Sequence, residues 1–190
     1  MYFNLANLIT ACRIALAPVL LVLAWQGKED AFLACLIASL VSDIVDGQVA
    51  RRFNLASALG ARLDSWADLL TYASVPLATW WLRPDIVSNE KVFFYTAVAS
   101  YAIPVAIGFM KFKQLTSYHT LMARISACVL GIAVIVLFAH GPVLPLRIAI
   151  CILVLAEVEE ICITFILPEP RLNVRSFRKA IEIKRALTSN

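Results

Sequence analysis

The sequence predicts an all-α integral membrane protein, a bundle of six transmembrane helices. Hydrophobic residues make up 61% of the 190 residues, against roughly 45–50% in soluble domains. Charged residues make up 16%, against roughly 25%. The apolar residues also gather in stretches of about 20 residues, the length of a helix that crosses a bilayer. Because a core this small cannot bury so many apolar side chains, part of them must face lipid.

Six expected spans follow one another with short connections. In chain order they cover residues 5–25, 31–50, 56–82, 92–110, 121–139 and 144–167. The first lacks the basic start and the cleavage pattern of a signal peptide, so we expect a retained helix with a kink at Pro18. We therefore expect one six-helix membrane domain, residues 1–167, and a basic tail, residues 168–190.

The distribution of Lys and Arg predicts that both termini face the cytoplasm, because cytoplasmic loops are enriched in these residues. The basic residues expected outside are Lys28, Arg83, Lys91 and Arg147. Those expected inside are Arg51, Arg52, Lys111, Lys113, Arg171, Arg175, Arg178, Lys179, Lys184 and Arg185. This orientation puts Trp25, Trp80 and Trp81 at the outer interface. The compactness of the chain and the lack of a transit peptide favour the cytoplasmic (inner) membrane. A net charge of only +4 gives no reason to expect a nucleic-acid partner.

The five cysteines are scattered in apolar stretches. They are Cys12, Cys35, Cys128, Cys151 and Cys162. Their spacing matches neither a disulfide framework nor a zinc site, so we expect them to be small buried side chains.

Four aspartates stand at specific spacings in the second and third expected spans. Asp43 and Asp46 are three residues apart, and Asp64 and Asp68 are four apart, so each pair shares one face of its helix. Acidic residues inside a membrane span are costly and usually functional. Because the connection between the two helices is short, both pairs can point to one place near the cytoplasmic end of the bundle.

This quartet predicts a metal site. Four ionised carboxylates at one place repel one another unless a cation balances their charge. Mg2+ prefers oxygen ligands and keeps positions for water and phosphate oxygens. Two divalent ions held by the four aspartates would make a site for phosphoryl chemistry. The alternative, protonated or ion-paired structural aspartates, leaves the residues between them unexplained.

The residues between the aspartates suit a nucleotide diphosphate. Gly47, Ala50 and Gly60 have little or no side chain and leave space beside the metals. Arg51 offers a planar fork that can bind phosphate. A lone glycine in a membrane helix is usually a packing residue, but the combination favours a ligand pocket.

Residues 43–68 read DIVDGQVARRFNLASALGARLDSWAD. This is D-x-x-D-G-x-x-A-R, eight residues, and then G-x-x-x-D-x-x-x-D. The pattern resembles the signature of the CDP-alcohol phosphatidyltransferase family. The earlier stretch NLITACR, residues 7–13, is similar to the N-x-L-T-x-x-R that often precedes this signature.

The resemblance implies a role for each matching residue. Asp43, Asp46, Asp64 and Asp68 would bind two Mg2+ or Mn2+ ions, and Asp68 would be the catalytic base. The cytidine diphosphate pocket would be lined by Gly47, Ala50, Arg51, Gly60 and Thr10. The implied reaction transfers a phosphatidyl group from CDP-diacylglycerol to a small alcohol and releases CMP, in phospholipid biosynthesis. The resemblance also implies a homodimer.

The sequence indicates the identity of the acceptor alcohol less specifically than it indicates the family. Glycerol 3-phosphate, serine and inositol phosphate are candidates. Asp64 to Pro76 looks somewhat like bacterial phosphatidylserine synthases, whereas the P-x-A-D-K pattern of glycerol-phosphate enzymes is absent around Asp68. Lys111, Lys113 and Arg124 are candidate ligands of an acceptor phosphate. An ordinary basic loop explains these three residues about equally well, and Thr120 is a candidate cap of the helix that follows.

Two further hypotheses remain open. A divalent-cation transporter would also place aspartates in a membrane, but these four gather toward one side and leave Arg51 without a role.

Glu157 and Glu160 share a face of the sixth expected span. Arg13 or Arg124 is a candidate counter-ion for these glutamates, and orienting the acceptor or the dimer is the alternative role.

Overall fold

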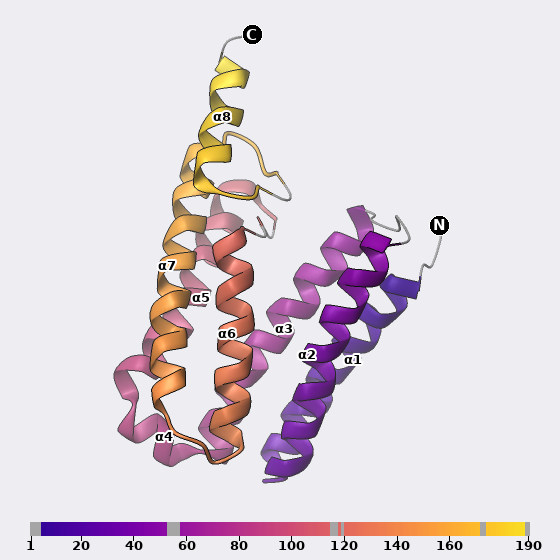
Figure 1. Cartoon of the computed structure of the whole chain (residues 1–190), viewed down its shortest axis with the longest axis vertical. Coiled ribbons are helices and arrows are strands. Elements are labelled where there is room, and N and C mark those ends of the chain that lie inside the picture. Colours follow the sequence, from indigo (N-terminus) through magenta and orange to yellow (C-terminus); the bar gives the residue numbers. More distant parts are fainter. Residues whose placement is uncertain (1–4, 53–57, 115–117, 119, 172–173, 189–190) are drawn as a thin grey trace. The chain divides into compact units, whose positions relative to one another are not determined.

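The computed structural model describes residues 5–52, 58–114, 118, 120–171 and 174–188. The side chains of residues 5–9, 44, 46–52, 58–59, 61–62, 64 and 187–188 lie outside this description. The described chain contains eight helices and no strand, so the all-α prediction is confirmed (Figure 1). The helices are α1 Leu5–Trp25, α2 Glu29–Arg52, α3 Ala58–Leu82, α4 Pro84–Asn89, α5 Lys91–Phe112, α6 Leu121–Phe138, α7 Leu144–Ile166 and α8 Phe177–Thr188.

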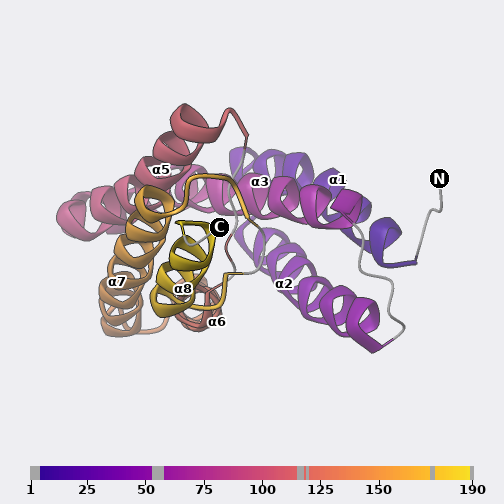
Figure 2. The same ribbon diagram turned by 90° about the horizontal axis from the view of Figure 1, so that it is seen from above.

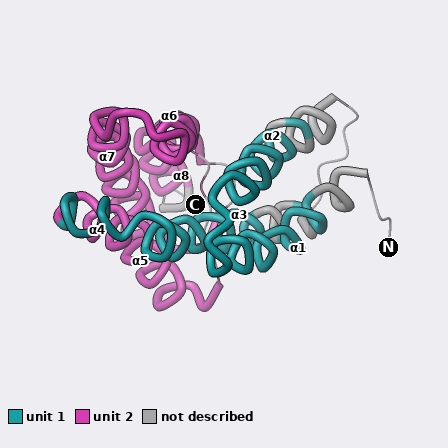
Figure 3. The backbone as a smooth tube through the Cα atoms, turned by 90° about the horizontal axis from the view of Figure 1, so that it is seen from below, with its two compact units in different colours: residues 1–91 teal, residues 92–190 magenta. Residues whose placement is uncertain are grey.

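Six of these helices match the six expected spans to within two residues at each end. The short helix α4 and the tail helix α8 were not expected. The chain divides into two compact units, residues 1–91 and residues 92–190 (Figure 3).

In the first unit, α1 packs against both α2 and α3 (Figures 1 and 2). Its buried residues recur every three or four positions and so form one stripe along the helix. They are Thr10, Arg13, Ala17, Leu20 and Ala24. The same spacing marks the buried stripe of α2, which is Phe32, Leu36 and Ser39, and that of α3, which is Ala67, Thr71, Ser74 and Ala78. The stripes of α1 and α2 are apolar toward one end and polar toward the other, whereas the stripe of α3 carries its polar residues, Thr71 and Ser74, in the middle.

A glycine marks the end of α1, and a proline marks the start of α4. Gly27 follows α1 with a φ of 70°, a left-handed conformation that glycine adopts without steric cost. Its N–H donates to the carbonyl of Ala24 at 3.0 Å. Pro84 begins α4, where its missing N–H costs no helical hydrogen bond.

In the second unit, α6 packs along α7, and α8 lies beside α7 (Figure 2). A buried cluster connects the end of α7 with the tail: Tyr118, Ile163, Leu167, Val174 and Ala180. The Tyr118 hydroxyl lies 3.0 Å from Thr164 Oγ1, and the Leu121 N–H donates to the Arg175 carbonyl. The tail therefore folds back onto the helices of the second unit.

Helix α8 is amphipathic. Its buried Ala180 and half-buried Ile183 face the cluster, while Arg178, Lys179 and Arg185 are exposed. Lys179 bonds to Glu182 at 2.8 Å, and this contact holds the pKa of the Glu182 carboxyl below its usual range.

Apolar side chains cover much of the outer surface of both units. Among the described residues, α5 and α6 are long and apolar enough to cross a membrane, and α1 contains a shorter apolar stretch, Thr10–Trp25. All five cysteines are free, three are exposed and none is buried, so our expectation of buried cysteines is wrong. That expectation assumed that apolar residues point inward, whereas here many point outward.

Candidate active site

The candidate site is built around Arg13, which lies on the buried stripe of α1. Its side chain is only 3% exposed. Its Nη1 lies 2.5 Å from Oδ1 of Asp43 on α2, and its Nη2 lies 2.7 Å from Oδ1 of Asp68 on α3. One guanidinium thus joins the first and the last aspartate of the motif, which are 25 positions apart in the sequence.

These three side chains differ in how far they are exposed to solvent. The Asp43 side chain is 43% exposed and that of Asp68 is 27% exposed, whereas the guanidinium is inside the bundle. A buried charge requires partners, and two carboxylates supply them here. The carboxylates lie at the rim, where a water-soluble molecule can reach them.

Other motif residues are described only in part. Asp46, Gly47, Ala50 and Arg51 lie in α2, and Asp64 lies in α3, but their side chains fall outside the described residues. Gly60 is half-buried on α3, and Thr10, 5% exposed, lies one turn before Arg13 on the buried stripe of α1.

Two buried hydroxyl groups lie one turn deeper than the aspartates. Ser39 precedes Asp43 by four residues on α2, and Thr71 follows Asp68 by three on α3. Ser39 Oγ and Thr71 Oγ1 are buried, and neither has a hydrogen-bond partner in the described part of the chain. Buried hydroxyls normally have a partner, often an ordered water, so this region suits polar ligands or water.

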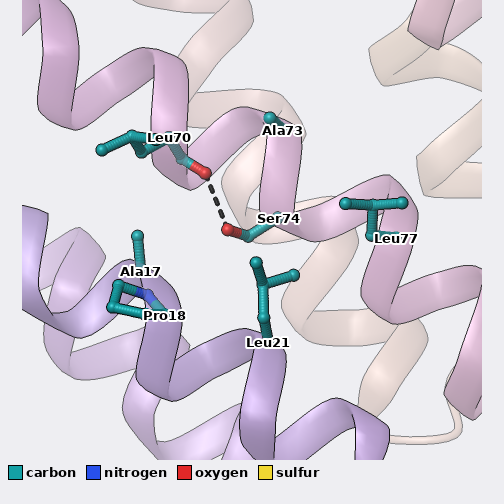
Figure 4. A pocket seen from close by; sticks show the side chains of 7 residues that line it. All are labelled: Ala17, Pro18, Leu21, Leu70, Ala73, Ser74 and Leu77. Carbon is teal, nitrogen blue, oxygen red and sulfur yellow. Dashed lines mark hydrogen bonds between the residues drawn. The ribbon is translucent and has the colours of Figure 1, made fainter.

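An apolar groove of about 180 Å³ lies between α1 and α3 (Figure 4). It begins next to the polar cluster of Arg13, Asp43 and Asp68, since Ala17 follows Arg13 by one turn and Leu70 follows Asp68 by two residues. Ser74 is its one polar lining residue, and this hydroxyl donates to the Leu70 carbonyl at 2.7 Å. The rest of the lining is Ala17, Pro18, Leu21, Leu70, Ala73 and Leu77.

The candidate acceptor residues lie in the second unit. Lys111 Nζ donates to the carbonyls of Thr164 and Leu167, both at 2.8 Å, so it caps the end of α7. Lys113 is exposed and follows α5 with a φ of 57°. Arg124 lies within α6, as expected, and its side chain is exposed. Thr120 caps α6, as expected, by accepting from the Ala123 N–H at 3.0 Å.

The sequence did not predict that Arg13 joins two aspartates; there Arg13 was expected only as a counter-ion for Glu157 and Glu160. Its sequence signal was a basic residue at the end of the N-x-L-T-x-x-R stretch. Only the packing of α1 on α2 and α3 identifies its partners.

Several known proteins are similar in sequence to this chain. The sequence model of a family described as CDP-alcohol phosphatidyltransferase matches residues 3–166. A CDP-diacylglycerol–glycerol-3-phosphate 3-phosphatidyltransferase of Salmonella choleraesuis is 36% identical over 93 residues, covering 43% of this chain and 50% of the relative. A putative cardiolipin synthase of Mycobacterium tuberculosis is 34% identical over 92 residues, covering 44% of each chain.

A more distant relative is a cardiolipin synthase (CMP-forming) / mitochondrial hydrolase fusion protein of Schizosaccharomyces pombe. It is 28% identical over 120 residues, covering 62% of this chain and 19% of the relative. The chain spans about half the length of the first two relatives. No solved structure is significantly similar to it.

Proposed function

Because the chain belongs to the CDP-alcohol phosphatidyltransferase family, we propose that it transfers a phosphatidyl group from CDP-diacylglycerol to the hydroxyl of a small polar acceptor. CMP is the second product, and the reaction is a step of phospholipid biosynthesis. The observation that carries the proposal is the meeting of Asp43 and Asp68, from two helices, at the guanidinium of Arg13.

Two described residues, Asp43 and Asp68, have the chemistry of divalent-metal ligands, although the described residues alone contain no group of three potential metal ligands. Asp43 and Asp68 supply carboxylate oxygens, the ligands that Mg2+ and Mn2+ prefer. Both carboxylates are partly exposed, and both contact Arg13. In the proposal, two Mg2+ or Mn2+ ions are held by Asp43, Asp46, Asp64 and Asp68. When bound, the ions would stabilise the negative charge of the diphosphate in the transition state.

The proposed reaction needs a base for the acceptor hydroxyl, and Asp68 is our candidate. Its carboxylate, at the rim of the bundle, would accept the hydroxyl proton. The hydroxyl oxygen would then bond to the phosphorus that carries the diacylglycerol. The bond from that phosphorus to the bridging oxygen would break, and CMP would leave with the bonding electrons.

The proposed nucleotide pocket consists of Thr10, Gly47, Ala50, Arg51 and Gly60. Thr10 is buried one turn before Arg13, on the side of the cluster away from the apolar groove. The small residues leave room for the cytidine, and Arg51 would pair with the diphosphate. The apolar groove beyond the cluster would then receive part of the diacylglycerol.

We propose that α1, α2, α3, α5, α6 and α7 all cross the inner membrane, with both termini and the site on the cytoplasmic side. Large apolar side chains on the outer faces support this: Val22 is 49% exposed, Leu155 62% and Phe165 66%. Trp25 and Trp80, 75% and 51% exposed, lie near the ends of α1 and α3 that are far from Arg13, as expected of an outer aromatic belt. In the same proposal residues 1–167 form the catalytic domain, residues 168–190 form a cytoplasmic tail, and the protein is a homodimer.

For the acceptor we propose a glycerol hydroxyl, that of glycerol 3-phosphate or of phosphatidylglycerol. The names of the Salmonella and Mycobacterium relatives support this choice over serine or inositol phosphate. They also weigh against our sequence argument from the missing P-x-A-D-K pattern. Lys111, Lys113 and Arg124 stay candidate acceptor ligands. The family match gives no support to the cation-transporter alternative.

The test is direct. Protein purified in detergent receives CDP-diacylglycerol, Mg2+ or Mn2+, and one acceptor at a time: glycerol 3-phosphate, phosphatidylglycerol, serine, inositol phosphate or inositol. CMP is measured by chromatography and the new lipid by mass spectrometry. We expect CMP with a glycerol acceptor and little with Asp43→Asn. A wild-type protein that releases no CMP with any acceptor would contradict the proposal.

A further inference from the structure

We propose that Arg13 is a positioning residue that holds Asp43 and Asp68 in place for metal binding, an inference that rests on the proposed function. Both ion pairs use the Oδ1 atom of the aspartate, at 2.5 Å and 2.7 Å. Arg13 therefore holds the Oδ1 atom of each carboxylate and limits how each carboxylate can rotate. Carboxylates that bind metals are commonly oriented in this way by a second residue.

The shape of the guanidinium suits this role. Its two terminal nitrogens lie in one plane at a fixed separation, so a single side chain can hold two carboxylates at a fixed spacing. Arg13 is 3% exposed on the helix that packs against both α2 and α3. Burial removes its freedom to follow the aspartates, so the aspartates are held relative to α1.

Removing Arg13 has two opposing effects on a bound cation. The loss of a positive charge would by itself strengthen the attraction between the aspartates and a metal ion. The loss of orientation would weaken binding, and residues that orient metal ligands typically contribute about 10- to 100-fold in affinity. The proposal states that orientation dominates. The sign of the change therefore separates positioning from simple charge balance.

The experiment measures Mn2+ binding by electron paramagnetic resonance on the whole protein in detergent, without substrate. In Arg13→Gln we expect the half-saturating Mn2+ concentration to rise about 10- to 100-fold. Arg13→Lys keeps the charge but has a single ammonium group, so its rise should be smaller yet measurable. The matched control is Arg83→Gln. Arg83 also contacts two carboxylates in the first unit, Glu29 at 3.5 Å and Asp85 at 3.4 Å, and its loss should leave Mn2+ binding unchanged.

Thermal unfolding of each variant separates positioning from a purely structural role. A lowered melting temperature with wild-type Mn2+ affinity would overturn the proposal, and so would tighter Mn2+ binding by Arg13→Gln. If Arg13→Gln does not fold, Arg13→Lys decides, and affinity equal to that of the wild type overturns the proposal. CMP release by the wild type separates a failure of the proposed function from a failure of the role proposed for Arg13. Its absence contradicts the proposed function, whereas CMP release together with unchanged Mn2+ affinity in the Arg13 variants contradicts only the role of Arg13.

Discussion

Asp68 has three roles in the proposed site, as a metal ligand, as a partner of Arg13 and as the base, and the last two make different demands on its carboxylate. As a partner of Arg13 it must stay ionised and oriented, while as a base it must accept a proton from the acceptor. Its side chain is 27% exposed, which leaves it accessible while Arg13 is buried. The ion pair and the proton transfer can therefore involve the same side chain at successive steps.

Replacing Asp68 with Asn should lower the rate of CMP release by about 10²- to 10⁴-fold, the usual contribution of a general base. The amide keeps the shape and can still contact Arg13, so the helices should remain folded. The measurement is the initial rate at saturating substrates. Asp85→Asn is the control, because Asp85 is an exposed residue of α4. An Asp68→Asn rate within a factor of two of the wild type would exclude Asp68 as the base.

At the scale of helices, polar side chains far away in the sequence complete the helix ends of the second unit. Lys111 from α5 donates to the last carbonyls of α7, which have no partner within their helix. Glu159 of α7 accepts from the N–H of Phe177, at the start of α8, at 3.0 Å. These contacts join the end of α5 to the end of α7, and the start of α8 to the body of α7.

Replacing Lys111 with Met should lower the free energy of unfolding by about 1–2 kcal/mol, because a charged donor and its favourable interaction with the end of α7 are lost. Chemical denaturation in detergent without substrate measures this. Lys113→Met is the control, since Lys113 is exposed just beyond α5. A residue that only bound the acceptor would raise the acceptor KM and leave this unfolding unchanged.

Replacing Glu159 with Ala should loosen the start of α8. The Phe177 N–H would lose its acceptor, and the positive end of the α8 dipole would lose a nearby carboxylate, together about 1 kcal/mol. Trypsin cleavage at Arg178 and Lys179 should then be about fivefold faster, since cleavage follows the population of the opened state. Glu159→Gln should lie in between, and Glu169→Ala should match the wild type. Equal cleavage in all variants would mean that Glu159 does not hold α8.

At the scale of the whole chain, the helix boundaries could be predicted, but the contacts between helices could not. Long apolar stretches set the six long helices. Helix α8 was not predicted because it contains no long apolar stretch. Its few apolar residues, such as Ala180 and Ile183, instead recur with the period of an amphipathic helix. The partners of Arg13 and Lys111 depend on packing between segments about 30 to 56 residues apart, which spacing along one helix does not determine.

The six-span arrangement predicts which thiols a water-soluble reagent can reach. Cys128 of α6 and Cys151 of α7 are exposed on the protein, so they should face lipid if these helices cross the bilayer. In proteoliposomes a membrane-impermeant maleimide should label them slowly, and denaturation in detergent should restore labelling. Rapid labelling of intact vesicles would place these residues in water and contradict the spans.

The same reagent tests orientation with two introduced cysteines. Ser88 in α4 and Glu169 after α7 are both exposed, and the proposal puts them on opposite sides of the membrane. Intact spheroplasts should therefore label Ser88→Cys, and inverted inner-membrane vesicles should label Glu169→Cys. The native thiols within the spans should contribute little background, which the unmodified protein checks. Labelling of both variants from one side would contradict the proposed orientation, because an odd number of crossings must separate the ends of α3 and α7.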